Sequence, residues 1–325
     1  MPDTVRGRYA PSPTGDLHLG NIRTALVAWL GARAQQGTFI LRIEDLDTPR
    51  VRPGAEAQML EDLSWLGLDW DEGPDVGGPY APYRQSERHD HYERALTQLD
   101  ETGRLYGCSC SRADLKRLAS APHGPLDEGP VYPGICRSRQ IDWQSQAGTT
   151  ARARIPAVRF QVSTGAVRFD DLLAGSVSQD VKTDVGDFVV RRADGIWAYQ
   201  LAVVVDDWAM GINQVVRGAD LLHSTPRQLQ LLQALGAPPP AYAHVPLTLD
   251  EKGQRLAKRE GAATLRALRE QGWQAQDLVG ILAHSLGLLP TPEPCVPRDL
   301  VASFEWARVA TTAWRAHVPE LGRSG

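Results

Sequence analysis

The sequence predicts an α/β fold built on a doubly wound parallel sheet, and three observations support this prediction. The apolar positions over 5–43 follow the order strand, loop, helix and strand, which is a βαβ unit. A similar alternation returns over 188–234, after a long segment of different character. The chain has 325 residues, 42% of them apolar and 23% charged, which is typical of a globular protein of about two domains.

The first βαβ unit lies at the N-terminus. Residues 5–10 form the expected first strand, and the loop after it contains two prolines and a glycine, which exclude a helix or a central strand. From Gly20 to about Gly37 apolar residues recur at spacings of three and four, which predicts a helix. Residues 39–43 then form a buried strand that ends at Glu44. Because such units bind ligands at the C-terminal ends of their strands, we expect a site beside Glu44.

The later elements divide the chain into four regions. The expected elements are helices over 55–66 and 88–102, strands over 153–160, 166–170 and 188–190, a helix over 198–208, a strand over 214–217 and a helix that opens at Ser224-Thr225-Pro226. The expected regions are the first half of the α/β domain over 1–102, an insertion over 103–181, the second half over 182–246, and a basic loop with a helical tail over 247–325.

Charge is segregated along the chain, although the net charge is only −4. Residues 54–83 hold seven acids and no base, whereas residues 251–270 hold six bases and three acids. These runs are either two solvated faces or, for the basic run, part of a nucleic-acid contact to which Arg152, Arg154 and Arg159 would add. The net charge excludes a bulk polyanion binder, so such a contact must be local.

The sequence shows no secretory or membrane signal. Its N-terminus lacks the apolar stretch of a secretory signal, and its longest apolar runs are far shorter than the roughly 18 residues of a membrane span. Four cysteines in so long a chain do not make a disulfide framework. We therefore expect a cytoplasmic protein without membrane contact.

The loop between the first strand and helix is the candidate nucleotide site. The chain contains neither G-x-x-x-x-G-K-[ST] nor, after its first strand, G-x-G-x-x-G, which excludes the common phosphate and dinucleotide loops. Backbone N–H groups and the positive end of the helix dipole nevertheless meet near His18, and Gly15 and Gly20 permit close approach of a ligand. His18 either donates a hydrogen bond to a phosphate oxygen or caps the helix.

Five ordered motifs give the chain a resemblance to a known family. The HIGH signature of class I aminoacyl-tRNA synthetases, in its glutamyl and glutaminyl form, resembles the run Arg8-Tyr9-Ala10-Pro11-Ser12-Pro13-Thr14-Gly15 with His18-Leu19-Gly20-Asn21. The resemblance continues at 42–47, 199–202 and 216–221, and residues 255–259 are similar to the KMSKS loop. Chance does not account for five motifs in this order.

The resemblance implies a Rossmann-like class I synthetase fold with a zinc-bearing insertion and a helical C-terminal region. It also implies activation of L-glutamate by ATP, with Mg²⁺ accompanying ATP and no tRNA needed for that step. The residues that match the family's glutamate site are Arg8, Tyr9, Ala10, Pro11, Ser12, Glu44, Tyr199 and Arg217. The residues that match its ATP site are His18, Gly20, Asn21 and Lys258, with His18 and Lys258 as the expected catalytic pair. Arginine forks suit carboxylates, and an acid suits the ammonium group of an amino acid.

The length of the tail favours one branch of the family. Only 67 residues follow Lys258, whereas a glutamyl-tRNA synthetase carries a large helical anticodon-binding domain there. The chain therefore resembles the short members that attach glutamate to the queuosine base of tRNA(Asp). A shortened synthetase acting on an acceptor end and a non-catalytic RNA- or amino-acid-binding paralogue are the alternatives. The KMSKS-like loop over 255–259, called the signature loop below, departs from the family at Arg255 and Ala257. We therefore expect the affinity for ATP to be the property that differs most from that of other members.

Three cysteines form a candidate metal site. Zinc prefers four soft or borderline ligands, and Cys108, Cys110 and Cys136 supply three. On spacing alone the fourth ligand is one of His123, Tyr132 and Cys295. The resemblance favours Tyr132, because the family pairs C-x-C with Tyr-x-x-x-Cys. One structural zinc ion would then close an insertion that has little core of its own, and three unliganded thiols are the alternative.

Overall fold

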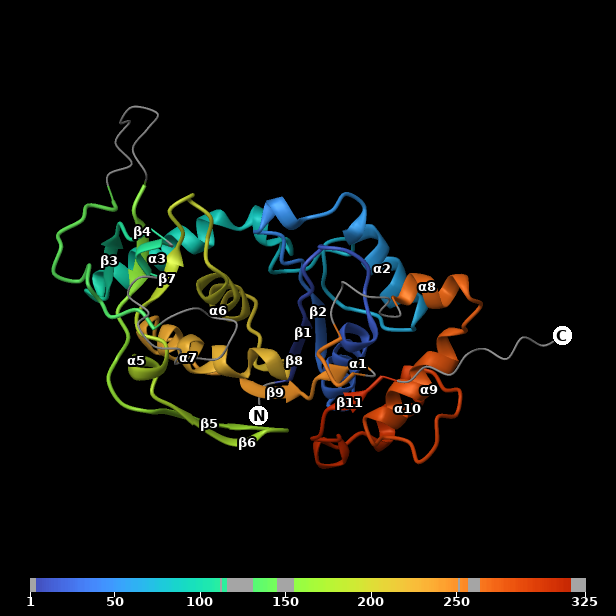
Figure 1. Ribbon diagram of the computed structural model, residues 1–325. Helices are drawn as coiled ribbons and strands as arrows, with labels where there is room; N and C mark the ends of the chain where they lie inside the picture. The colour runs from blue at the N-terminus through green and yellow to red at the C-terminus, as the bar shows by residue number, and fades with distance from the viewer. Residues whose placement is uncertain are drawn as a thin grey trace.

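A six-stranded sheet lies at the centre of the computed structural model, which describes residues 4–111, 113–115, 131–144, 155–250, 252–256 and 264–316 (Figure 1). Its strand order is β2-β1-β8-β9-β5-β6. The strands are β1 Arg6–Tyr9, β2 Thr38–Leu41, β5 Val167–Asp171, β6 Gly175–Gln179, β8 Gln214–Gly218 and β9 Ala241–Val245. Every neighbouring pair is parallel except the β5–β6 hairpin at one edge. The predicted parallel α/β sheet is confirmed.

Each face of this sheet packs against a different hydrophobic core. Successive side chains of a strand point to opposite faces, so neighbouring residues of one strand belong to different cores. Phe39 and Val216 belong to the core around α1 (Leu19–Arg33). Their sequence neighbours Ile40 and Val215 belong to a second core on the other face. Both faces are thereby covered, as a doubly wound sheet requires. The helices between the strands are α2 Ala55–Trp65, α3 His89–Glu101, α5 Val181–Asp184, α6 Tyr199–Ala209 and α7 Thr225–Ala234.

A second, antiparallel sheet carries the cysteine-bearing segment. Its strands are β3 Leu105–Cys108, β4 Ala157–Phe160 and β7 Phe188–Arg191. The strand expected at 188–190, which was counted in the second half of the α/β domain, pairs with β4 of this sheet, and the ring of Phe188 lies 5.5 Å from that of Phe160. The strand expected at 166–170 belongs to the six-stranded sheet, beside β9. Alternation alone identifies both strands but does not say which sheet each joins.

The C-terminal region is helical, as expected, and packs on α1. It contains α8 Leu265–Glu270, α9 Ala275–Ser285 and α10 Pro297–Leu300, and it ends at β11 Trp314–Arg315, which pairs with β10 Thr248–Leu249. Arg23 of α1 is fully buried and donates to the carbonyl of Pro246 at 2.7 Å and to the hydroxyl of Ser285 at 3.1 Å. Short 3-10 turns lie at Thr48–Arg50, Gln85–Glu87, Ala219–Ser224, Val301–Ser303 and Trp306–Arg308.

The acidic and basic runs of the sequence lie against each other. Arg269 of α8 pairs with Glu61 and Asp62 of α2, at 2.7 and 2.9 Å. Arg266 pairs with Asp16 at 3.3 Å. Both arginines form ion pairs within the chain. This part of the basic run is therefore not a free surface for nucleic acid.

Of the three arginines expected to add to a basic contact, only Arg159 lies within the described residues. Arg159 is buried, with its guanidinium carbon 3.7 Å from the ring centroid of Tyr132. Arg152 and Arg154 lie outside the described residues. Within the ranges that the structure describes, its helices include none of the length and apolar character needed to cross a bilayer.

Candidate active site

A pocket of about 510 Å³ lies at the C-terminal ends of β1 and β8. The sequence-predicted residues that line it are Arg8, Tyr9, Ala10, Pro11, Ser12, His18, Gly20, Asn21, Glu44, Tyr199 and Arg217. Lys258 lies outside the described residues. The structure therefore brings to one pocket every other residue that the sequence placed at a glutamate or ATP site.

His18 is the N-cap of α1. Its Nδ1 accepts hydrogen bonds from the backbone N–H groups of Gly20 at 3.1 Å and Asn21 at 3.4 Å. The side chain of Asn21 accepts in return from the backbone N–H of His18 at 3.2 Å, which completes a reciprocal capping box. Since Nδ1 is an acceptor, a neutral imidazole carries its proton on Nε2. The helix cap proposed from the sequence is thus present, and it makes the Nε2 side of the ring a donor at the pocket.

Three buried charged side chains and the part-buried Glu44 form one network beside the pocket. Arg8 donates from Nε to Asp207 at 3.1 Å and from a terminal nitrogen to the carbonyl of Val216 at 3.0 Å. Arg42 donates to the same oxygen of Asp207 at 2.6 Å and to Glu44 at 3.0 Å. Asp207 therefore holds two guanidinium groups, and Arg42 links it to the acid at the end of β2.

The network shifts the pKa of its two carboxylates in opposite directions. Burial alone raises the pKa of Asp207, but the positive charges of Arg42 and Arg8 more than offset this and lower it. For Glu44 burial prevails, and its pKa is raised despite the same two arginines. Sequence reasoning assigned no role to Asp207. Its signal was a pair of adjacent acids, Asp206 and Asp207, inside a largely apolar helix.

Arg217 has an open hydrogen-bonding position. At the end of β8 it donates from Nε to His244 at 3.0 Å and from one terminal nitrogen to the hydroxyl of Thr225 at 2.8 Å. The other terminal nitrogen, NH1, is buried and has no hydrogen-bond partner among the described residues. Because an unpaired buried guanidinium N–H is costly, this position suits the carboxylate of a bound ligand.

The described part of the signature loop also borders the pocket. Arg255 pairs with Asp220 at 2.5 Å, and both residues line the pocket. The backbone N–H of Leu256 donates to the carbonyl of Thr248 at 2.9 Å, which fixes the start of the loop against β10. The arginine that replaces a family lysine here forms an ion pair within the chain.

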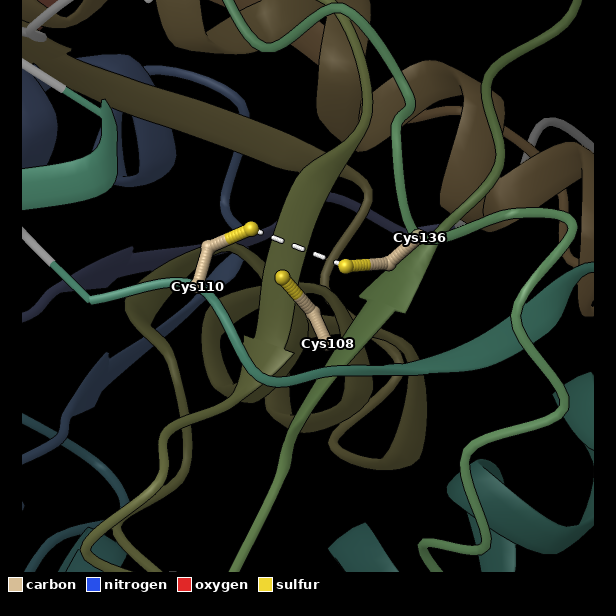
Figure 2. Close-up of side chains that lie close together, drawn as sticks. All are labelled: Cys108, Cys110 and Cys136. Atoms are coloured by element: carbon tan, nitrogen blue, oxygen red, sulfur yellow. Dashed lines mark hydrogen bonds between the residues drawn. The ribbon is translucent and has the colours of Figure 1, made fainter. Parts of the chain in front are cut away.

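A second site lies in the insertion, where three thiols converge (Figure 2). The sulfur atoms of Cys108, Cys110 and Cys136 all lie within 4.8 Å of one another, and those of Cys110 and Cys136 are 3.6 Å apart. The phenol oxygen of Tyr132 lies 3.6 Å from the sulfur of Cys108 and accepts the backbone N–H of Cys136 at 3.0 Å. All four cysteines of the chain are free thiols. These donors fit one tetrahedrally coordinated metal ion.

Neither alternative fourth ligand is placed at this cluster. Cys295 packs against the core around α1 and α9, and its thiol is not part of the group of three. His123 lies outside the described residues. Burial raises the pKa of Cys136, but hydrogen bonds from Tyr132 and the neighbouring thiols lower it to about 7. A thiol of this kind ionises readily, and the thiolate is the form that binds metal.

Comparison with known proteins gives concordant findings. The family model described as "tRNA synthetases class I (E and Q), catalytic domain" matches residues 4–316. A protein of Symbiobacterium thermophilum named glutamyl-Q tRNA(Asp) synthetase is 53% identical over 303 residues, which cover 93% of this chain and 93% of that protein. A glutamate–tRNA ligase of the same organism is 44% identical and covers 94% of this chain but 64% of that protein. The crystal structure of a glutamate tRNA ligase from Elizabethkingia meningosepticum, in complex with its amino acid, aligns with a TM-score of 0.82 and 30% identity, covering 96% of this chain and 67% of that one.

Proposed function

Because this chain belongs to the class I glutamyl- and glutaminyl-tRNA synthetase family, we propose that it activates L-glutamate with ATP and transfers it to the queuosine base in the anticodon of tRNA(Asp). Relatives named for this activity are 53% and 50% identical over more than nine-tenths of both chains. The observation that best supports the amino-acid specificity is the pocket itself, where a buried N–H group of Arg217 has no partner in the described parts of the chain and Arg8 and Glu44 lie nearby.

In the first step a carboxylate oxygen of glutamate attacks the α-phosphorus of ATP. A new P–O bond forms, the bond to the β-phosphate oxygen breaks, and pyrophosphate leaves. The nucleophile is supplied by the substrate, so the protein acts by holding two anions in line and by stabilising negative charge. Arg8 and Arg217 provide charge for the glutamate carboxylates, and Glu44 accepts from the ammonium group.

The phosphates require donors at the start of α1. We assign this role to the Nε2–H of His18 and to the ammonium group of Lys258, with Gly20 and Asn21 lining the ATP side. ATP enters as its Mg²⁺ complex, whose charge screens the phosphates. In the second step a hydroxyl oxygen of the modified base attacks the acyl carbon of the adenylate. The bond between that carbon and the phosphate oxygen breaks, so that an ester forms, AMP leaves and the hydroxyl proton is released.

The metal in the insertion is, in this proposal, one structural zinc ion held by Cys108, Cys110, Tyr132 and Cys136. Zinc bound by three thiolates and one oxygen has no open position for substrate, so its contribution is to folding. It would fix β3 and the segment around Tyr132 to each other. The thiols must stay reduced to bind zinc, so we also propose that the protein acts in a reducing compartment such as the cytoplasm.

The test uses the full chain with ATP, labelled glutamate, and tRNA with or without queuosine. Label that depends on queuosine in tRNA(Asp) supports the proposal. Label on the acceptor end of tRNA(Glu) identifies a shortened glutamyl-tRNA synthetase instead, and failure to form any adenylate identifies a non-catalytic paralogue. Arg217→Ala should abolish labelling, whereas Arg168→Ala, on an exposed strand position, should leave it unchanged.

A further inference from the structure

Behind Arg217 the structure holds a buried chain of hydrogen bonds that the proposed function does not use. Nε of Arg217 donates to Nε2 of His244 at 3.0 Å, and Nδ1 of His244 lies 2.6 Å from a carboxylate oxygen of Asp171. Arg217 and Asp171 are each 5% exposed, and His244 is 2% exposed. The three residues come from three neighbouring strands, β8, β9 and β5.

The geometry allows one tautomer of the imidazole. A guanidinium group only donates hydrogen bonds, so Nε2 of His244 must be the acceptor towards Arg217. The proton of the neutral ring is then on Nδ1, where the carboxylate of Asp171 accepts it. The hydroxyl of Thr225, 3.2 Å from Nε2, is compatible with this assignment because it can donate to that nitrogen.

Asp171 is itself held firmly. Its other oxygen accepts backbone N–H groups from Leu173 at 3.0 Å, Ala174 at 2.8 Å and His244 at 3.1 Å. The carboxylate therefore cannot turn away from the imidazole without breaking several bonds. Arg217 and His244 are direct partners in the register of β8 and β9, which places their side chains on the same face of the sheet.

We propose that Asp171 and His244 are positioning residues that fix the guanidinium of Arg217 through the Nδ1–H tautomer, and so set the affinity for the substrate glutamate. This inference rests on the proposed function of the pocket. With Nε and one terminal nitrogen occupied by His244 and Thr225, the NH1 nitrogen of Arg217, which no described residue contacts by a hydrogen bond, is the position left for a substrate carboxylate. Loss of the acceptor at Nε2 frees the guanidinium to rotate, and the preformed arrangement disappears.

The same arrangement predicts a loss of glutamate affinity in acid. The charged and polar groups that face the imidazole are Asp171 from β5, Arg217 from β8, Tyr242 from β9, Thr225 from α7 and, at longer range, Arg8 from β1. Burial lowers the pKa of His244, which Asp171 raises and Arg217 lowers again, with a net decrease. Protonation at low pH puts an N–H of His244 against the N–H of Arg217, and the contact between them is lost.

The decisive variant is Asp171→Asn. An asparagine keeps one oxygen for the backbone N–H groups and turns an amide N–H₂ towards Nδ1, which forces the proton of His244 to Nε2. Two donors then meet at the contact with Arg217. We expect the KM for glutamate in ATP–pyrophosphate exchange to rise at least about tenfold, the effect of one hydrogen bond to a charged group, with the KM for ATP unchanged. Asp170→Asn, at the exposed neighbour on the same strand, is the matched control and should change neither value.

The tautomer can be measured without any variant. In the unmodified full chain, ¹⁵N shifts and couplings of the histidines should assign the proton of His244 to Nδ1, and the KM for glutamate should rise as the pH falls. A proton on Nε2, or an Asp171→Asn protein that is folded and keeps its KM for glutamate, overturns the proposal. Equal increases of both KM values would also overturn it, because they indicate a general structural effect. Absence of exchange in the unmodified chain refutes the proposed function itself, whereas the tautomer result concerns only the positioning of Arg217.

Discussion

Replacement of Asp207 by alanine tests the charge network beside the pocket. The carboxylate accepts from Arg8 at 3.1 Å and from Arg42 at 2.6 Å, and the side chain of Arg42 is fully buried. Breaking a buried ion pair costs about 3–5 kcal/mol, so we expect Asp207→Ala to lower the free energy of unfolding by about that amount. Arg8 also loses its fixed orientation, which should raise the KM for glutamate at least about tenfold.

Urea unfolding and ATP–pyrophosphate exchange measure the two effects. The urea midpoint should fall with an unchanged slope, because the surface exposed on unfolding is the same. Asp207→Asn keeps an acceptor oxygen without the charge and should give an intermediate loss. Asp90→Ala, at an exposed position of α3, should change the free energy of unfolding by less than about 0.5 kcal/mol. If Asp207→Ala unfolds at the same urea concentration as Asp90→Ala and keeps its KM for glutamate, the network does not have the role given to it here.

Acid should weaken the same network without a mutation. Although burial raises the pKa of Asp207, Arg42 and Arg8 lower it below the value in the unfolded chain. The unfolded chain therefore binds the proton first, and this contribution to stability is complete above about pH 4 and is lost as the pH falls through the folded-state pKa. The acid loss should be smaller in Asp207→Asn, which has no proton to bind at this position.

Three further predictions concern the metal, the signature loop and the charged helix pair. Cys108→Ser should reduce the zinc content by about one ion per chain, since a structural site needs all four ligands, and full occupancy on metal analysis would exclude this site. Lys258→Ala should abolish glutamate-dependent ATP–pyrophosphate exchange because a charge on the phosphates is lost, and unchanged exchange would remove Lys258 from the mechanism. Arg269→Ala leaves Asp62 buried without its ion-pair partner and should cost about 1–3 kcal/mol in urea unfolding, with the KM for tRNA unchanged. A raised KM for tRNA would instead show that this part of the basic run contacts the RNA.

The first βαβ unit and most of the pocket could be predicted from the sequence, because their signals are local. The strand, loop and helix at the N-terminus are contiguous, and Glu44 follows shortly after the next strand, β2. Asp207, His244 and Asp171 could not be predicted in this way. Each acts on an arginine that is distant in sequence, and only the strand order β8-β9-β5 brings two of them to Arg217. For a similar reason the sequence did not predict which sheet β5 and β7 join. Alternation shows which residues face inward, but it does not show which neighbouring strand pairs with them.

The order in which the chain visits its two sheets has a consequence for cooperativity. After β4 in the three-stranded sheet the backbone builds the β5–β6 hairpin in the large sheet, returns for β7 and leaves again for β8. Neither sheet is therefore a continuous piece of polypeptide that could be excised or melted by itself. Heat should disrupt the cysteine cluster and the amino-acid pocket in one calorimetric transition. Exchanging the insertion over 103–181 between relatives would exchange two strands of the six-stranded sheet, β5 and β6, along with it.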